Sequence, residues 1–219
     1  MQGKSTVRNI AAQLEEEIVL GRLLPKERLI EDDLIDRFKV KRHIVREALS
    51  ILQVAGLLVR ERNKGAMVRS LTPHEVEDLY VVRRLLEEGA VQIMPLPVAP
   101  DIVEKLIAIH EEHQACVRAG NLRKVFHLNL AFHRTVYSAA NNDALADSIE
   151  SYCQKTHVCR SYSIGDPAML NRAVEEHAAM IEAIVNQQRD VLSKLVIDHM
   201  RPAKEAYLQR LGAGASNFS

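Results

Sequence analysis

The chain has 219 residues, and its 29 lysines and arginines balance its 29 aspartates and glutamates. This length is sufficient for two modest domains, each with a core of its own. The three cysteines lack Cys-x-x-Cys spacing, so we expect reduced thiols and no disulfide framework. No apolar run approaches the roughly 20 residues of a membrane span, and charges interrupt the first residues where a signal peptide needs an apolar stretch. We therefore expect a cytoplasmic protein without a membrane partner.

The charge is distributed unevenly along the chain. Residues 1–70 carry 14 basic and 10 acidic side chains, whereas the remainder carries 15 and 19. Between residues 36 and 69 the excess grows to nine basic against three acidic side chains. Such a local positive field is typical of a surface that binds phosphates, although charge alone also fits an ordinary solvated surface.

Apolar spacing predicts three short helices and a hairpin in this basic part of the chain. Glycines end the first and third helices, and an Asn-Lys-Gly turn separates the two alternating strands of the hairpin. This order of elements predicts a winged helix-turn-helix. The predicted elements are helices over residues 7–20, 30–38 and 44–54 and a hairpin over residues 57–70.

Positive charge gathers at the front of the third helix. In a helix-turn-helix, the second helix of the pair lies in the major groove and presents its first residues to base edges and phosphates. Arg42, His43 and Arg46 occupy this front, and the two arginines lie one turn apart on a shared face. We expect them to contact DNA, although a single arginine here can also pair with a nearby acid. Further contacts to the DNA backbone are expected from Arg60, Arg62, Lys64 and Arg69 of the hairpin, where Gly65 permits close approach.

The stretch "LLPKERLIEDDLIDRFKVKRHIVREALSILQVAGLLVRERNKGAMV" resembles the DNA-binding domain of GntR-type bacterial transcriptional regulators. Two residues depart from the family pattern. Lys26 replaces a usual Gly, and Lys41 replaces the Ser that would cap the recognition helix; a lysine can reach phosphate but cannot accept the free N–H groups. We expect this domain to span residues 1–72. The resemblance implies DNA contacts at Arg28, Lys41, Arg42, His43, Arg46, Lys64 and Gly65.

The second part of the chain, residues 73–219, shows helical periodicity throughout. The segment "PLPVAP" interrupts it once, and no strand pattern appears. We therefore expect a mainly α protein, in which an all-helical antiparallel bundle follows the winged helix-turn-helix. The predicted helical stretches are residues 74–94, 101–120, 121–140, 143–163, 171–188 and 189–211.

Four polar residues in this bundle are candidates for a metal site. Asn129 and His133 lie four residues apart and thus on one helix face, while His177 and His199 belong to two other helices. Three imidazoles and one oxygen suit a first-row transition metal. Nine histidines in a helical chain also produce such spacings by chance, so the residues alone leave a surface or capping role open.

"NLAFHRTVYSAANNDAL", "EEHAAMIEAIVNQQRD" and "IDHM" resemble the FCD effector-binding domain of the FadR-type branch of the same family. The resemblance implies metal ligands at Asn129, His133, His177 and His199, where many members have Asp at the first position. An amide brings no charge, so we expect a weaker site, or one selected for a different metal or effector. The expected cofactor is a divalent transition metal such as zinc, nickel or manganese. The family's R-x-x-L-E motif falls on Arg83 and Glu87. His127, His157 and Cys153 are expected to be packing or surface groups.

These expectations combine into one functional hypothesis. A basic DNA-binding domain joined to a metal-containing helical pocket predicts a ligand-responsive transcriptional regulator, a repressor that a small organic acid releases from DNA. Arg83 and Arg160 are the candidate partners of the effector carboxylate. A homodimer on an inverted repeat is expected, because one recognition helix offers few base contacts. The alternative is a metal-dependent hydrolase with Glu175 or Glu176 as general base, although the chain lacks the HExxH motif.

Overall fold

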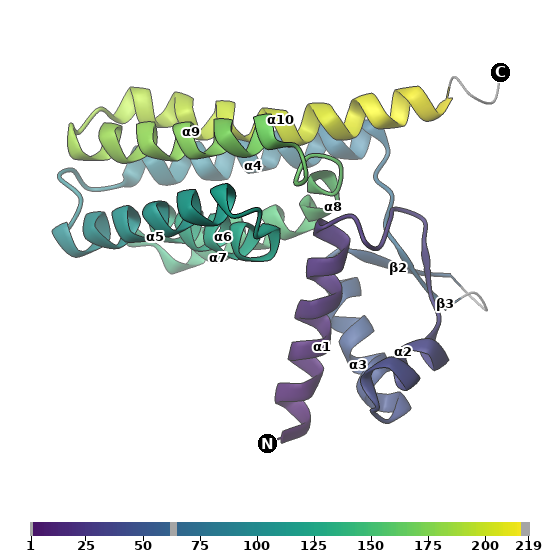
Figure 1. Cartoon of the computed structure of the whole chain (residues 1–219). Coiled ribbons are helices and arrows are strands. Elements are labelled where there is room, and N and C mark those ends of the chain that lie inside the picture. Colours follow the sequence, from purple (N-terminus) through teal and green to yellow (C-terminus); the bar gives the residue numbers. More distant parts are fainter. Residues whose placement is uncertain (1, 62–64, 216–219) are drawn as a thin grey trace.

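The computed structural model describes residues 2–61 and 65–215. An N-terminal module of three helices and a small sheet lies at one end of a larger helical bundle (Figure 1). The sheet has the order β1-β3-β2 and is antiparallel, with Arg28 opposite Met67 and Arg60 opposite Ala66. The elements of this module are α1 (Gln2–Val19), β1 (Arg28–Leu29), α2 (Glu31–Phe38), α3 (Arg42–Val54), β2 (Leu58–Glu61) and β3 (Gly65–Val68).

The predicted winged helix-turn-helix is confirmed, with one addition. Strand β1 precedes the helix-turn-helix and turns the expected hairpin into a three-stranded sheet. Two residues are too short for an alternating pattern, so the strand leaves no signal in the sequence. Lys39 makes the corner between α2 and α3 in the left-handed conformation, with a φ of 52°. This corner determines the orientation of α3 relative to α2.

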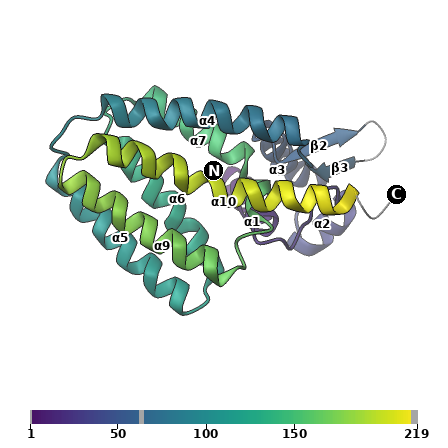
Figure 2. The same cartoon turned by 90° about the horizontal axis from the view of Figure 1, so that it is seen from above.

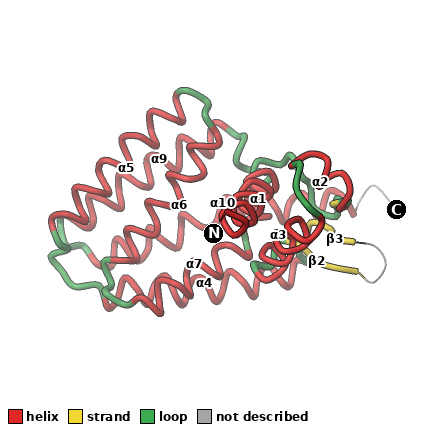
Figure 3. The backbone as a smooth tube through the Cα atoms, turned by 90° about the horizontal axis from the view of Figure 1, so that it is seen from below, coloured by secondary structure: helices red, strands yellow, loops and turns green. Residues whose placement is uncertain are grey.

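The second part of the chain is a helical bundle. Four of its helices begin at side-chain caps: Thr72 forms a capping box with Glu75, and Asn121, Asn142 and Asp166 each accept a backbone N–H. Figures 2 and 3 show the long helices running alongside one another, with the sheet confined to the far end. The helices are α4 (Pro73–Ile93), α5 (Pro100–Arg118), α6 (Leu122–Ser138), α7 (Asp143–Lys155), α8 (His157–Arg160), α9 (Pro167–Val185) and α10 (Arg189–Ala215).

The expectation of one continuous helix over residues 143–163 was wrong. The chain leaves the helical conformation at Thr156, which separates α7 from the single turn of α8. The Thr156 hydroxyl donates to the carbonyl of Cys153 at 2.8 Å and accepts from Arg83 Nη1 at 3.1 Å. A tertiary hydrogen bond from α4 thus fixes the break, which redirects the chain so that Arg160 lies at the interior site described below.

Two hydrophobic clusters form the core. One lies wholly within the bundle, while the other joins α1, α2, α3 and the sheet to Val158 of α8 and to Met200 and Tyr207 of α10. The Tyr207 hydroxyl also accepts a hydrogen bond from the backbone N–H of Leu71 at 2.8 Å. The C-terminal half of α10 extends past the bundle to make these contacts (Figure 2). No helix among the described residues is long and apolar enough to cross a membrane.

Candidate functional site

The recognition helix α3 presents its basic residues on an open surface. The side chains of Arg42 and Arg46 are 51% and 58% exposed. Both pair with acids at the start of α2: Arg46 Nε lies 2.9 Å from Glu31, and Arg42 Nη2 lies 2.5 Å from Asp32. Exposed pairs of this kind contribute little stability, so the arginines can exchange these carboxylates for DNA phosphates or bases at small cost.

The other predicted DNA contacts surround this front. Lys41 is the N-cap of α3 and makes no side-chain capping bond, as the sequence argument expected. Arg28 and His43 are exposed, and Gly65 has a φ of 77° that favours glycine. Arg62 and Lys64 lie outside the described residues.

Two hairpin arginines have partners within the protein. Arg60 Nη2 donates to the carbonyl of Arg46 at 3.3 Å and so lies beside the recognition helix. Arg69 instead donates to Glu75 of α4 at 2.7 Å, where it reinforces the capping box. Arg69 thus has a structural role in the protein, and its contact with the DNA backbone stays a prediction.

Helices α6, α9 and α10 bring His133, His177 and His199 together in the bundle interior. One nitrogen from each ring lies within 4.8 Å of the other two. The Nε2 atoms of His133 and His199 face each other at 3.0 Å. Two nitrogens that bind one metal at about 2.1 Å and at right angles are about 3.0 Å apart, so this spacing fits a shared ion.

The hydrogen bonding of the cluster also fits a metal. Both ring nitrogens of His177 are buried without a partner among the described residues, as is Nδ1 of His133. His199 Nδ1 lies 2.6 Å from Glu176 Oε2, which assigns the proton to Nδ1 and leaves Nε2 as an acceptor for the Nε2–H of His133 or for a metal. Burial lowers the pKa of His133 and of His177 well below the usual histidine value, so both rings are in the neutral form that metals require.

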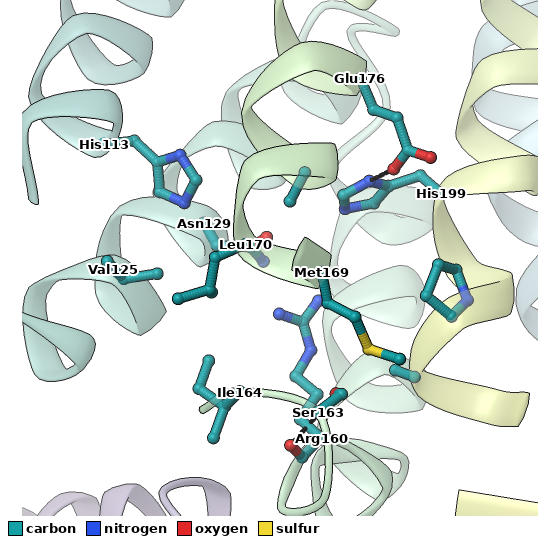
Figure 4. A pocket seen from close by; sticks show the side chains of 13 residues that line it. His113, Val125, Asn129, Arg160, Ser163, Ile164, Met169, Leu170, Glu176 and His199 are labelled. Atoms are coloured by element: carbon teal, nitrogen blue, oxygen red, sulfur yellow. Dashed lines mark hydrogen bonds and ion pairs between the residues drawn. The ribbon is translucent and has the colours of Figure 1, made fainter. Parts of the chain in front are cut away.

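The side chain of Asn129, on α6, lies buried between the histidines and Arg160. With its amide oxygen turned toward Arg160 it accepts hydrogen bonds from Nη1 at 2.9 Å and from Nη2 at 3.1 Å. In the opposite orientation the oxygen would face only acceptors and the nitrogen only donors, so the orientation toward Arg160 is the one that satisfies both atoms. Figure 4 shows the Arg160 side chain extending toward Asn129, with Glu176 bonded to His199 nearby.

The two predicted effector arginines differ in how they are bonded. Arg83 is buried on α4, where Nε donates to Glu87 at 2.9 Å and Nη1 donates to Thr156 at 3.1 Å. The Tyr137 hydroxyl donates to the other oxygen of Glu87 at 2.5 Å, which completes a buried network. Arg160 has no carboxylate partner among the described residues, and it is therefore the better placed of the two to bind an anion.

A cavity of about 690 Å³ adjoins the cluster, a volume suited to a small organic ligand. A smaller cavity of about 70 Å³ lies beside it, and Asn129 and Arg160 line both. The larger cavity is lined by His133, Arg83, Glu87, Tyr137 and Glu15, among others.

Sequence reasoning missed two residues of this region and gave a third a different role. His113 of α5 is buried, with its ring centroid 5.0 Å from that of His177 and its Nδ1 without a partner among the described residues. Glu15 comes from α1 of the DNA-binding module and lines the larger cavity. Glu176 had been considered only as a general base, but here it orients His199. No motif marks His113 or Glu15, because their position depends on how distant helices pack.

The comparisons with known proteins agree with this architecture. Residues 78–202 match the FCD domain, and residues 6–68 match the family described as bacterial regulatory proteins, gntR family. The chain is 26% identical over 206 residues to the uncharacterized HTH-type transcriptional regulator YdhC of Bacillus subtilis, covering 94% of this chain and 92% of that protein. It is 25% identical over 197 residues to the gluconate operon transcriptional repressor of Bacillus licheniformis, covering 87% and 80%.

A solved structure, E. coli McbR/YncC, superimposes with a TM-score of 0.80 and covers 94% of this chain and 98% of its own. Its sequence identity is 20%, so this likeness shows the fold alone. The hydrolase alternative finds no support in these matches. Since the FCD match covers more than half of the chain, the protein belongs to the gntR family of bacterial regulatory proteins, as a DNA-binding transcriptional regulator with an effector-binding FCD domain.

Proposed function

We propose that this regulator is a repressor, which a small organic acid releases from its operator. The observation that carries the proposal is the cavity beside the three-histidine cluster: His133 of the cluster lines the 690 Å³ space together with Arg160, which has no carboxylate partner among the described residues, and His199 and Arg160 line the smaller adjoining cavity. Such an arrangement favours an anion. The name of one relative, the gluconate operon repressor, also refers to an organic acid.

The residues of the cluster fit a divalent transition metal such as zinc, nickel or manganese. His133, His177 and His199 supply neutral nitrogens, and Asn129 supplies an oxygen once its amide turns from Arg160. A metal held by these residues would supply Lewis-acid binding of a carboxylate. Arg160, no longer bonded to Asn129, then binds the same carboxylate, while Arg83 holds the cavity wall through Glu87.

On the DNA side, Arg42, His43 and Arg46 enter the major groove. Arg28 and Lys41 bind flanking phosphates, together with the wing tip at Lys64 and Gly65. A homodimer on an inverted repeat supplies two such sets of contacts, which a single recognition helix cannot. The cytoplasm, where the chromosome lies, is the proposed location. Light scattering tests the dimer, and a monomeric mass that operator DNA leaves unchanged would contradict it.

A thermal-shift screen tests the effector proposal. The nickel-loaded protein is melted with gluconate, glucuronate, citrate and hexanoate, each at millimolar concentration. A ligand that binds only the folded state raises the melting temperature, and at about 100 times its dissociation constant it stabilises by about 2.7 kcal/mol. Arg160→Ala should abolish the rise. If no acid raises the melting temperature of the wild type, the organic-acid proposal is wrong.

A further inference from the structure

Three consecutive glutamates end helix α1 of the DNA-binding module, and each contacts a different element. Glu15 contacts α7 and α8 on the cavity side. Glu16 accepts hydrogen bonds from Arg123 of α6 at 2.8 Å and lies 3.1 Å from His127. Glu17 accepts two hydrogen bonds from Arg37 of α2, one of them at 2.8 Å. One helical turn therefore links the effector cavity, the metal-site helix and the helix-turn-helix.

The contacts of Glu15 leave one carboxylate oxygen available. Oε1 accepts from Gln154 Nε2 at 2.9 Å and from His157 Nδ1 at 2.9 Å. No hydrogen bond from any described residue reaches Oε2, although Glu15 lines the 690 Å³ cavity together with Arg160. Burial works to raise the pKa of Glu15, but the bonds from His157 and Gln154 outweigh it and hold the pKa below its usual value. The DNA-binding module thus contributes an ionised acceptor to the cavity wall.

The segment that carries Gln154, His157 and Arg160 is also the surface on which the module rests. A Cβ placed on Gly21, just beyond α1, would lie 2.9 Å from the carbonyl oxygen of Ser161. Val158 belongs to the same hydrophobic cluster as the core of the module. Because this segment and α1 are closely packed, a movement of one should displace the other. The Glu17–Arg37 hydrogen bonds then connect α1 to α2.

We propose that Glu15 is the effector-sensing residue through which the cavity controls the DNA-binding module. This inference rests on the proposed function. An acid whose carboxylate binds at Arg160 can donate a hydroxyl hydrogen bond to Glu15 Oε2, and ligand binding then changes the position of α1. The cavity accordingly selects acids that carry a hydroxyl group remote from the carboxylate. A ligand shifts an equilibrium between two states only if it binds one state more tightly than the other. A contact with a second structural element can provide this difference in affinity.

The test measures coupling directly. Operator DNA is selected from a random library, and its dissociation constant for the nickel-loaded full chain is measured by fluorescence anisotropy at fixed salt. Each protein is titrated with and without saturating gluconate, glucuronate, citrate or hexanoate. The measured quantity is the ratio of the two dissociation constants, so a change in basal DNA affinity cancels.

Glu15→Gln is the test variant, because it keeps the shape and one acceptor but replaces the other oxygen with a donor. Glu16→Gln is the matched control, since Glu16 also joins α1 to the bundle but does not line the cavity. A hydroxy acid should raise the dissociation constant at least tenfold in the wild type and in E16Q, and less than threefold in E15Q. Glu15→Asp, which shortens the side chain, should also lose the response, and it replaces E15Q if that variant does not fold.

The possible outcomes separate the two proposals. If E15Q, or E15D in its place, responds to the acid as strongly as the wild type, the role of Glu15 is refuted while the effector proposal stands. An equally strong response to hexanoate, which has no hydroxyl group, also contradicts it. If no acid changes melting or DNA affinity in the wild type, the proposed function fails, and the sensing role fails with it.

Discussion

Replacing His177 with leucine should make the protein at least as stable as the wild type without metal, but less stable than the wild type when metal is bound. The side chain is fully buried, stacked on Phe132 at a centroid distance of 4.0 Å, and both its ring nitrogens lack partners among the described residues. An unsatisfied buried polar group costs about 1–3 kcal/mol, whereas the lost ring stacking is worth about 0.5–1.5 kcal/mol. Without metal, His177→Leu should therefore melt at the same temperature as the wild type or higher.

Metal should stabilise only the wild type. At 100 times its dissociation constant, an ion adds about 2.7 kcal/mol, which for a chain of this size raises the melting temperature by about 5–10 °C. Differential scanning fluorimetry in EDTA and in nickel or zinc measures both states. His113→Leu is the control, because His113 is buried with an unpartnered Nδ1 among the described residues but lies outside the three-nitrogen cluster. If metal raises the melting temperature of His177→Leu as much as that of the wild type, this reasoning is refuted.

Three further outcomes follow from the structure. Arg46→Ala should weaken operator binding by about 1–3 kcal/mol in anisotropy titrations at fixed salt, and unchanged affinity would remove the assignment of α3. Gly21→Ala should lower the melting temperature more than Gly120→Ala: both have a positive φ, but only at Gly21 would a Cβ approach another backbone. Equal losses of melting temperature in the two variants would show that the backbone at Ser161 moves to accommodate the added Cβ. Glu75→Gln should cost about 1 kcal/mol at pH 7 in urea unfolding. The cap and Arg69 lower the pKa of Glu75 from 4.5 to about 2, so this difference should shrink as pH falls from 4.5 toward 2; a difference independent of pH would contradict the assignment.

The sequence predicts the elements well where one periodic pattern determines them. Apolar spacing locates the helices of the DNA-binding module, because each buries one face against the others. It does not predict the break at Thr156, which depends on a hydrogen bond from Arg83, 73 residues away. The helical spacing of apolar residues extends through this position, and only the tertiary contact reveals why the chain turns there.

The site was predictable only in part. Spacing alone placed Asn129 and His133 on one helix face, but the convergence of His177 and His199 with them followed from a family resemblance. The buried pairing of Arg83 with Glu87 was open to inference from their i,i+4 spacing, since such pairs are neighbours on a helix. The Asn129–Arg160 contact and the entry of Glu15 into the cavity depend on how separate helices pack, which no local pattern encodes.

The operator affinity of the metal-loaded wild type, measured with and without a bound hydroxy acid, decides whether effector binding controls DNA binding. Binding of the acid is first established by its effect on melting, and the anisotropy titration is then performed at one salt concentration. The account predicts that the dissociation constant for operator DNA rises at least tenfold when the acid is bound. An acid that demonstrably occupies the cavity and leaves operator affinity unchanged would contradict it.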